Sequence, residues 1–271
     1  MIEAVLVLGA VGLVFGTGLA VASRFLAVKQ DERMEAIEEV LPGANCGACG
    51  VPGCGAFATA VVEGDASPSG CTVGGAQVAE RVADILGVEL DDTGGQKVAH
   101  VLCWGGEEDR TVQYVYDGLE DCRAMEYLGE GSLSCRHGCL QLGNCIRECP
   151  FDAISEGPKG IPVVDRDKCT ACGICVGACP RNIIKLIDIE QKLVVECSNP
   201  GTARDVRSVC KAGCLACRMC VRACPNEAWA MGDDNLPVLD NEKCQLAGDC
   251  LEKCPTKVIK SMVKEKVAAS S

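Results

Sequence analysis

Histidine and aromatic residues are scarce in this chain of 271 residues, and it has no excess of positive charge. It has 2 His, and Phe, Trp and Tyr together make up 3% of the sequence. So few large rings exclude a single broad core built on aromatic packing. Something other than aromatic side chains must therefore organise the fold. Lys and Arg number 26 against 38 Asp and Glu, which gives a formal net charge of −12. A chain this acidic is not expected to bind nucleic acid, because phosphate groups repel negative charge.

Cysteine, in contrast, is abundant, with 23 residues. A disulfide framework is typical of short secreted chains, and an odd count would leave one thiol unpaired. Zinc sites use two Cys pairs, or one pair and His, separated by a finger-length loop. Here the cysteines recur every three residues in runs closed by Cys-Pro, the spacing with which one tight loop of thiolates wraps a cubane cluster. We therefore predict several [4Fe–4S] clusters that carry single electrons.

One apolar segment lies near the amino terminus. Residues 4–23 contain no charged side chain and, at about 1.5 Å per residue, are long enough to span the roughly 30 Å hydrocarbon core of a bilayer. Residues 20–22 resemble a signal-peptide cleavage site, but Glu3 stands where a signal peptide carries positive charge, so we expect a retained anchor. Basic residues follow the segment and none precedes it. The positive-inside rule therefore predicts a single span of the inner cell membrane with the bulk of the chain in the cytoplasm.

A small metal-binding module is predicted after the anchor, over residues 29–90. We expect an amphipathic helix near Met34–Leu41 and a second helix over Ala76–Leu86. Between them lie four cysteines interspersed with glycines, which let backbone N–H groups approach cluster sulfurs. These cysteines are Cys46, Cys49, Cys54 and Cys71. A structural zinc ion is the alternative for this set, since zinc also accepts four thiolates.

Most of the remaining cysteines belong to an internal repeat. Cys-Pro occurs four times, at Cys149, Cys179, Cys224 and Cys254, each time followed by a similar tail: CPFDAI, CPRNII, CPNEAW and CPTKVI. One constant shift along the sequence maps the first Cys-Pro pair onto the third and the second pair onto the fourth. The same shift maps the segment IPVVDRDKC onto LPVLDNEKC. This self-similarity indicates that one half of the repeat is a duplicate of the other.

Each half of the repeat resembles a bacterial two-cluster ferredoxin, in which the Cys before Pro binds the cluster of the other Cys run. Two of the runs are complete. The resemblance implies one cluster bound by Cys149, Cys169, Cys172 and Cys175. It implies another bound by Cys214, Cys217, Cys220 and Cys254.

The other two runs each lack the middle cysteine. One consists of Cys139, Cys145 and Cys179, with Leu142 in the middle position; the other consists of Cys224, Cys244 and Cys250, with Ala247 in that position. A missing thiolate near Ala247 predicts a [3Fe–4S] centre, or a fourth iron bound by water or by a carboxylate such as Asp249.

Five further cysteines have no place in an ordinary ferredoxin. They are Cys103, Cys122, Cys135, Cys197 and Cys210. The shift of the repeat pairs Cys122 with Cys197 and Cys135 with Cys210, so these four could bind an extra cluster between the halves while Cys103 completes the site at Leu142. Alternatively, Cys135 completes that site and Cys103 joins the extra cluster. Some of the five could instead be buried free thiols. Six cubanes would use about 24 thiolates, so we expect five or six clusters.

Taken together, the order of these motifs resembles the B subunit of the Rnf complex, in its long form with two ferredoxin-like modules. The segments that carry the resemblance are LPGANCGACGVPGC, CRHGCLQLGNCIRECPFDAI and CKAGCLACRMCVRACP. It implies an electron-carrying subunit of a membrane ferredoxin:NAD⁺ oxidoreductase coupled to Na⁺ or H⁺ translocation. Such a subunit would accept electrons from soluble ferredoxin and pass them to the other subunits, with no acid, base or nucleophile of its own. NAD and flavin would bind elsewhere, because the chain lacks a strand–GxGxxG–helix fingerprint.

Two other functions compete with this one. A corrinoid iron–sulfur protein shares the first motif but needs a large cobamide-binding barrel, for which 271 residues leave no room. A membrane-anchored polyferredoxin that reduces a redox-sensing regulator is the open alternative. In either case we expect an α+β chain with a transmembrane anchor (1–28), an N-terminal four-Cys domain (29–90), a linker with extra cysteines (91–133) and ferredoxin-like modules over 134–190 and 191–271.

Overall fold

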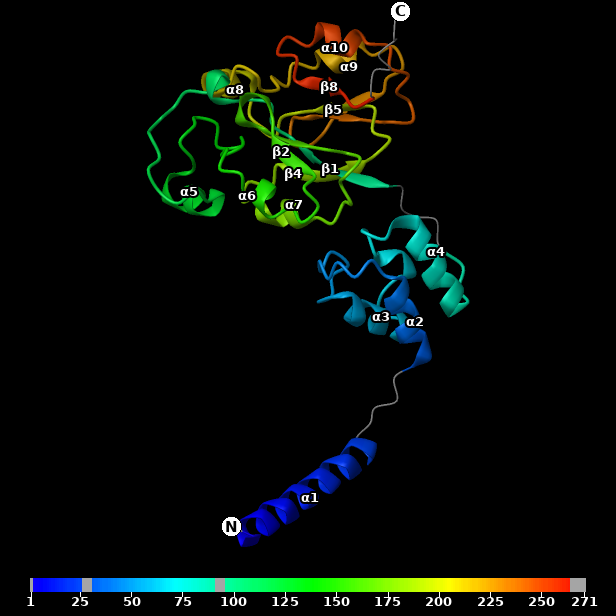
Figure 1. Ribbon diagram of the computed structural model, residues 1–271. Coiled ribbons are helices and arrows are strands. Elements are labelled where there is room, and N and C mark those ends of the chain that lie inside the picture. Colours follow the sequence, from blue (N-terminus) through cyan, green and yellow to red (C-terminus); the bar gives the residue numbers. More distant parts are fainter. Residues whose placement is uncertain (1, 26–30, 91–95, 264–271) are drawn as a thin grey trace, which may run out of the picture.

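The structure is a computed structural model that describes residues 2–25, 31–90 and 96–263; for residues 2–8, 24 and 25 it describes the backbone only. Short helices and four two-stranded antiparallel sheets alternate along the chain, which confirms the α+β class (Figure 1). A long helix comes first, a small helical unit follows it, and two ferredoxin-like halves make up the rest.

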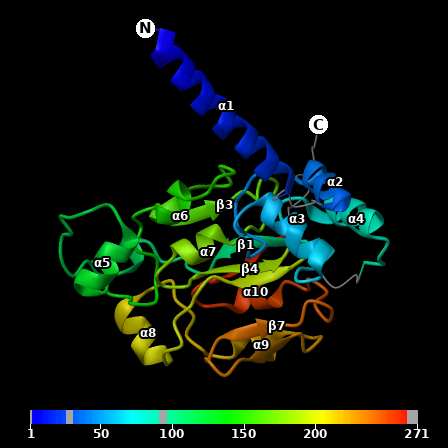
Figure 2. The ribbon, with the colours of Figure 1, turned by 90° about the horizontal axis from the view of Figure 1, so that it is seen from below.

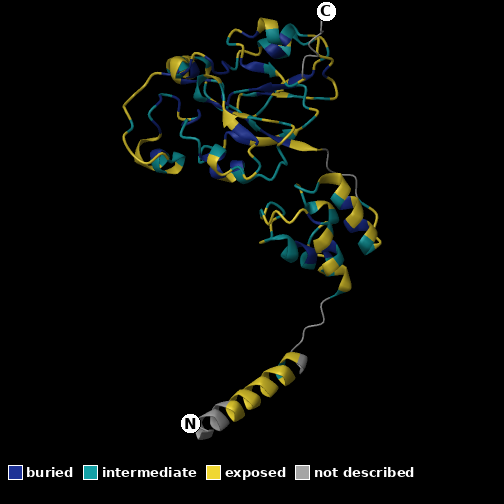
Figure 3. Cartoon of the chain, in the orientation of Figure 1, coloured by how far each residue is buried: buried dark blue, intermediate teal, exposed yellow. Residues whose placement is uncertain are grey.

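The first helix, α1 (Ile2–Phe25), contains the segment predicted to be a membrane anchor. Its described side chains are nearly all exposed (Figure 3), and Leu13, Phe15 and Leu19 are 69%, 68% and 71% exposed. Residues 4–8 of the predicted anchor lie outside the residues whose side chains are described. Within the part of the chain that is described, no helix combines the length and the apolarity needed to cross a membrane. The transmembrane span therefore stays a prediction.

The small helical unit encloses a core of its own. Its elements are α2 (Glu32–Val40), α3 (Cys54–Glu63), the 3-10 turn η1 (Pro68–Gly70) and α4 (Gly75–Leu86). The two helices predicted in this region are confirmed. Ile37, Phe57 and Val82, one from each α-helix, are at most 1% exposed, because the apolar positions recur with helical period on every one of them. This core holds the two ends of the cysteine-bearing loop between α2 and α3.

The first ferredoxin-like half combines a strand pair, a hairpin and short helices. Its elements are β1 (Lys97–Val101), α6 (Asn144–Arg147), β2 (Ile154–Glu156), the 3-10 turn η3 (Pro158–Gly160), β3 (Pro162–Val164), α7 (Ile174–Ala178) and β4 (Ile184–Asp188). β2 pairs with β3, and β1 pairs with β4 in a register that sets Ala99 opposite Leu186. β1 comes from the segment in which the sequence predicts a linker, so this half takes one strand from residues before 134.

Apart from the additional helix α8, the second half repeats the order of strands and helices and the strand pairing of the first, as expected of a duplication. Its elements are β5 (Leu193–Val195), α8 (Ala203–Val209), α9 (Met219–Ala223), β6 (Trp229–Met231), β7 (Pro237–Leu239), α10 (Asp249–Lys253) and β8 (Ile259–Ser261). β5 pairs with β8 and β6 with β7. β5 and β8 thus correspond to β1 and β4 of the first half.

The halves differ by an insertion in the first one. The stretch from the end of β1 to Cys135 is more than twice as long as the stretch from the end of β5 to Cys210. The longer stretch carries the 3-10 turn η2 (Glu107–Asp109) and α5 (Cys122–Gly129). In both views α5 lies at the edge of the molecule, away from α9 and α10 (Figures 1 and 2). The buried guanidinium of Arg181 holds the insertion in place, because it donates to the Glu126 carboxylate and to three backbone carbonyls.

Candidate iron–sulfur centres

The four cysteines of the helical unit, Cys46, Cys49, Cys54 and Cys71 (set I), line one pocket around about 320 Å³ of empty space. The loop that carries them turns at Gly47, Gly50 and Gly53, whose φ angles of 70°, 88° and 99° are readily adopted by glycine alone. The side-chain oxygen of Asn45 accepts a 2.8 Å hydrogen bond from the Cys54 N–H and fixes the start of α3. The structure therefore brings together the four cysteines that the sequence predicts to act jointly.

The first complete ferredoxin run also gathers as expected. Set II consists of Cys149, Cys169, Cys172 and Cys175. Cys149 lies in the Cys-Pro turn after α6, Cys169 and Cys172 in the loop that leads into α7, and Cys175 in the first turn of α7. Burial raises the pKa of Cys175 to about 11, and the three other thiols of the set act in the same direction. The N–H of Ala99 in β1 donates to the sulfur of Cys169 over 3.4 Å. The strand from the predicted linker thus contributes to the surroundings of set II.

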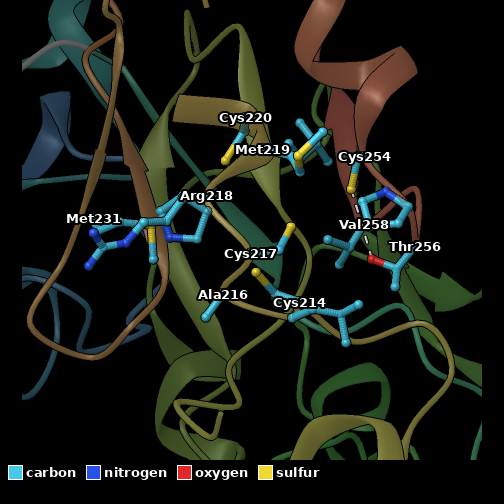
Figure 4. Close-up of a pocket in the computed structure, with 14 residues that line it drawn as sticks. Cys214, Ala216, Cys217, Arg218, Met219, Cys220, Met231, Cys254, Thr256 and Val258 are labelled. Atoms are coloured by element: carbon cyan, nitrogen blue, oxygen red, sulfur yellow. Dashed lines mark hydrogen bonds between the residues drawn. The ribbon is translucent and has the colours of Figure 1, made fainter. Parts of the chain in front are cut away.

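The second complete run forms the pocket drawn in Figure 4. Cys214, Cys217, Cys220 and Cys254 (set V) surround about 370 Å³ of empty space, and their sulfurs lie around the same hollow (Figure 4). Cys214 and Cys217 belong to the loop that leads into α9, Cys220 is the second residue of that helix, and Cys254 follows α10. Burial raises the pKa of Cys214 and of Cys220 to about 11. The Cys before Pro crosses to the other run, as the ferredoxin resemblance implies.

All four cysteine loops of the two halves share one backbone conformation. In each loop the third and fifth residues have φ between 48° and 85°, the left-handed region. The pairs are Gln141 and Gly143, Ala171 and Gly173, Ala216 and Arg218, and Leu246 and Gly248. Alternating backbone conformations of this kind turn successive N–H groups toward an anion. The two loops that lack a middle cysteine therefore keep the conformation of the complete ones.

Near Leu142 the insertion brings a fourth thiol beside the incomplete loop. Cys122, the first residue of α5, lines one pocket together with Cys139, Cys145 and Cys179 (set III) around about 390 Å³ of empty space. Burial raises the pKa of Cys145 to about 12, and Cys179 and Cys122 act in the same direction. The sequence assigns this place to Cys103 or to Cys135. The structure shows neither arrangement.

A further pocket lies between the two halves. Its cysteines are Cys103, Cys135, Cys197 and Cys210 (set IV), around about 320 Å³ of empty space. Cys103 comes two residues after β1, and Cys197 comes two residues after β5. Cys135 lies four residues before Cys139, and Cys210 lies four residues before Cys214. Cys139 and Cys214 are the first cysteines of the loops that follow. Set IV therefore takes two cysteines from each half at equivalent positions.

This grouping corrects the pairing of Cys122 with Cys197 that a uniform shift between the halves predicts. The shift holds from Cys135 onward, but the insertion displaces everything before it, so Cys103 is the counterpart of Cys197. In the sequence, the equivalence of Cys103 and Cys197 is indicated only by the strand-forming segments that end two residues before each cysteine. Cys103, which has no counterpart under the shift, is thus an integral member of the repeat.

The last set contains three cysteines. Cys224, Cys244 and Cys250 (set VI) lie near one another, since the charges of the first two raise the pKa of Cys250, after burial as the main cause. A hydrogen bond from Trp229 acts on the same thiol in the opposite direction. Ala247, in the middle of the loop, is exposed, and Asp249, the first residue of α10, is half-buried. No cysteine of the chain is left to complete this set, because the six sets use all 23.

The donor sets fit cubane clusters. All 23 cysteines are free thiols in this structure. In sets I, II, III, IV and VI, backbone N–H groups point at cysteine sulfurs in short contacts of 3.3 to 3.5 Å, as is typical of protein-bound clusters. They are the N–H groups of Gly74 on Cys71, Ala99 on Cys169, Gln141 on Cys139, Asn199 on Cys197 and Ala228 on Cys224. Among the described residues, no group of three or more His, Cys, Asp or Glu is arranged to hold a single metal ion.

Comparison with protein families agrees with this chemistry. Residues 41–73 match the family model “Putative Fe-S cluster”, and residues 162–185 match the model “4Fe-4S binding domain”. The first match spans set I, for which zinc was the alternative. The second spans the loop of set II and extends to β4.

Relatives extend over nearly the whole chain. The B subunit of the Na(+)-translocating ferredoxin:NAD(+) oxidoreductase complex of Acetobacterium woodii is 44% identical over 96% of this chain and 78% of its own length. The chain belongs to this family of B subunits. The B subunit of the ion-translocating oxidoreductase complex of Methanosarcina acetivorans is 36% identical over 96% of this chain and 97% of its own. The proton-translocating counterpart of Clostridium ljungdahlii is 38% identical over 97% and 93%. The resemblance to the Rnf B subunit is thereby confirmed.

Proposed function

We propose that the chain is the electron-carrying iron–sulfur subunit of a membrane-associated, Rnf-type ferredoxin:NAD⁺ oxidoreductase that translocates Na⁺ or H⁺. In this role it accepts electrons from soluble ferredoxin and relays them to other subunits of the same complex. Sets I to V would each bind a [4Fe–4S] cluster, and set VI would bind a sixth. When bound, such clusters take up and release single electrons without acid–base chemistry by the protein.

The observation that supports this proposal is that a cysteine of each set lies near a cysteine of the next, so that the six sets can be ordered as one row. The charge of Cys46 in set I adds to the rise in pKa that burial gives Cys172 in set II. In the same way Cys175 of set II acts on Cys145 of set III. Cysteines of sets I and II, and of sets II and III, therefore lie close enough for their charges to act on one another.

The row continues through the pocket between the halves. The N–H of Cys139 in set III donates to the sulfur of Cys103 in set IV over 3.4 Å. The equivalent contact in the second half joins set V to set IV. Burial raises the pKa of Cys197 in set IV to about 11, and a hydrogen bond from the N–H of Cys214 in set V acts in the opposite direction. Cys220 of set V and Cys224 of set VI are four residues apart, about one helical turn. An electron that entered at either end could thus pass through all the sets in order.

The residues around the sets bind the thiolates, orient them and exclude water from most of them. The cysteines of set IV are between 5% and 9% exposed. On the loop of set VI, Leu246 and Ala247 are exposed, whereas Cys244 and Cys250 are each 6% exposed. We propose a [3Fe–4S] centre there, or a fourth iron bound by water or by Asp249, because the loop keeps the conformation of its complete counterparts and lacks only the thiolate.

We further propose that α1 anchors the subunit to the inner membrane, with the six sets on the cytoplasmic side. The support is the uncharged segment 4–23 and the exposure of apolar residues such as Leu13 and Phe15 on the described part of the helix. Membrane fractionation tests this directly. The full chain is expected in the membrane fraction, and a chain that begins at residue 29 is expected in the soluble fraction when expressed without other subunits.

The proposed function is tested by replacing one cysteine in the middle of the row. In the complete complex, Cys197→Ser is expected to abolish ferredoxin-dependent NAD⁺ reduction while the other subunits still copurify. Ser substitution of the exposed Thr111 is the matched control and should leave the activity unchanged. Undiminished NAD⁺ reduction by the Cys197→Ser complex would overturn the proposal. Loss of a transcriptional response alone would instead favour a polyferredoxin that reduces a redox-sensing regulator.

A further inference from the structure

One buried arginine faces the pocket between the halves. Among the described residues, Arg110 is the only charged residue that is buried as a whole, with 5% of its surface exposed. It lies in the insertion and forms a backbone bridge with Cys210, a member of set IV. Arg110 also lines the pocket of set IV together with the four cysteines. Its guanidinium is therefore held beside the place where the four thiols converge.

The hydrogen bonds of this guanidinium are incomplete. Nη1 donates to the carbonyl of Cys139 over 2.8 Å, and Nε donates to the carbonyl of Gly106 over 3.4 Å. Nη2 is buried and has no hydrogen-bond partner among the described residues. No carboxylate of those residues forms an ion pair with Arg110 either. A buried charge without a counter-charge is strongly unfavourable, so an anion is expected beside it.

Arg181 shows what a purely structural arginine looks like in the same region. Its side chain is 3% exposed, but it forms an ion pair with Glu126 and donates to the carbonyls of Cys135 and Gly138. Its charge is thus balanced within the protein. Arg110 pins the carbonyl of Cys139 in a similar way, but nothing in the described part of the chain balances its charge.

Two glycines keep the space around Arg110 free. A Cβ atom on Gly138 would lie 2.5 Å from Nη1 of Arg110, and a Cβ atom on Gly105 would lie 2.8 Å from the sulfur of Cys210. Both distances are shorter than van der Waals contact allows. Larger residues at these positions would push the guanidinium or the thiol away, so the close approach of Arg110 to set IV depends on both glycines.

The electrostatic effect of Arg110 reaches the thiols. Burial raises the pKa of Cys103, and the positive charge of Arg110 opposes that rise. A positive charge and an N–H donor near a cluster favour its reduced state, which carries one more negative charge than the oxidised state. Set IV lies in the middle of the row, and no other set has a buried, unbalanced cation among the described residues.

We propose that Arg110 is a positioning residue that raises the reduction potential of the cluster bound by set IV, so that this cluster is the first of the row to hold an electron. The inference rests on the proposed function, because it requires a cluster in set IV. An electron that arrives from either half would then be retained between the halves until the next acceptor is available.

The test is an anaerobic redox titration of the full chain followed by low-temperature EPR. Cys210→Ser first identifies the signal of set IV as the one that it removes. Arg110→Gln is expected to shift the potential of that signal to a more negative value and to leave the signal of set I in place. An Arg110→Gln chain with its full iron content and an unchanged potential would overturn the inference.

A second variant keeps the test decisive if Arg110→Gln binds no cluster in set IV. Gly138→Ala retains the arginine but displaces its guanidinium, so it is expected to shift the potential in the same direction by a smaller amount. An unchanged potential in that variant would also overturn the inference. Failure of the underlying proposal is distinguishable, because Cys210→Ser would then leave both the spectrum and the iron content as in the unaltered chain.

Discussion

The backbone N–H of Cys122 donates a 2.9 Å hydrogen bond to the side-chain oxygen of Asn144, which is 3% exposed. The amide nitrogen of Asn144 donates in turn to the carboxylate of Asp121 over 2.7 Å. Asn144 is the first residue of α6 and belongs to the loop whose middle position is Leu142. This side chain thus ties the insertion to the loop that lacks a cysteine, and it positions the thiol that completes set III.

Asn144→Ala is expected to weaken set III selectively. The variant leaves the half-buried Cys122 N–H without its acceptor, which costs about 1 kcal/mol of folding stability. It also frees Cys122 from the loop, so we expect the loss of about four irons per chain, the content of one cubane. Thermal unfolding and iron quantitation under anaerobic conditions measure both effects. Gln113→Ala, an exposed position of the same insertion, is the control and should change neither quantity.

The grouping of the extra cysteines makes a prediction about pairs of substitutions. Cys122→Ser and Cys139→Ser should each remove the cluster of set III, so the double variant should lack about four irons, no more than either single variant. Cys103→Ser combined with Cys139→Ser should lack about eight, because these residues belong to different sets. If Cys103 instead completed the site at Leu142, the two double variants would give the opposite results.

Ala247→Cys should convert set VI into a four-cysteine site. We expect a gain of about one iron per chain and the replacement of a three-iron EPR signal by that of a cubane. Leu142→Cys is the matched control, since it introduces the same residue at the equivalent position of a loop that Cys122 already completes. No gain of iron is expected there. A gain at position 142 equal to that at 247 would contradict the assignment of Cys122 to set III.

The cluster-free chain should lose stability in alkaline solution. Burial raises the pKa of Cys139 and of Cys145 from 9.0 to about 12, so the folded state retains protons that the unfolded state releases. Their contribution to stability is therefore complete below about pH 9 and is lost as the pH rises toward 12. The Tm of the cluster-free chain should fall over this range. Replacing both residues by Ala should reduce the slope, and an equal slope in that variant would count against the buried, neutral thiols.

Much of the candidate site could be predicted from the sequence because ligand spacing in ferredoxin loops is local. The intervals within Cys169–Cys175 and within Cys214–Cys220 fix which thiols share a loop, and the Cys-Pro position supplies the fourth. The α+β class followed from the same resemblance. Set I was equally clear, since its four cysteines lie within one short segment.

The partition of the extra cysteines could not be predicted, because it depends on contacts between distant segments. The insertion shifts the register before Cys135, and the strand pairing of β1 with β4 is what identifies Cys103 as the equivalent of Cys197. Nothing in the spacing of Cys122 indicates that α5 folds back onto α6. Arg110 was missed for the same reason, since its burial results from the packing of the insertion against the second half.

The central claim is that the cysteines form six cluster-binding sets, and the most direct measurement is anaerobic quantitation of iron and acid-labile sulfide in the full chain. We predict about 24 irons per chain, or one fewer when set VI binds a three-iron centre, with a similar amount of sulfide. A content of about 16 irons, as four clusters would give, would contradict the assignment of sets III and IV. Zinc in place of iron, with no acid-labile sulfide, would contradict the account as a whole.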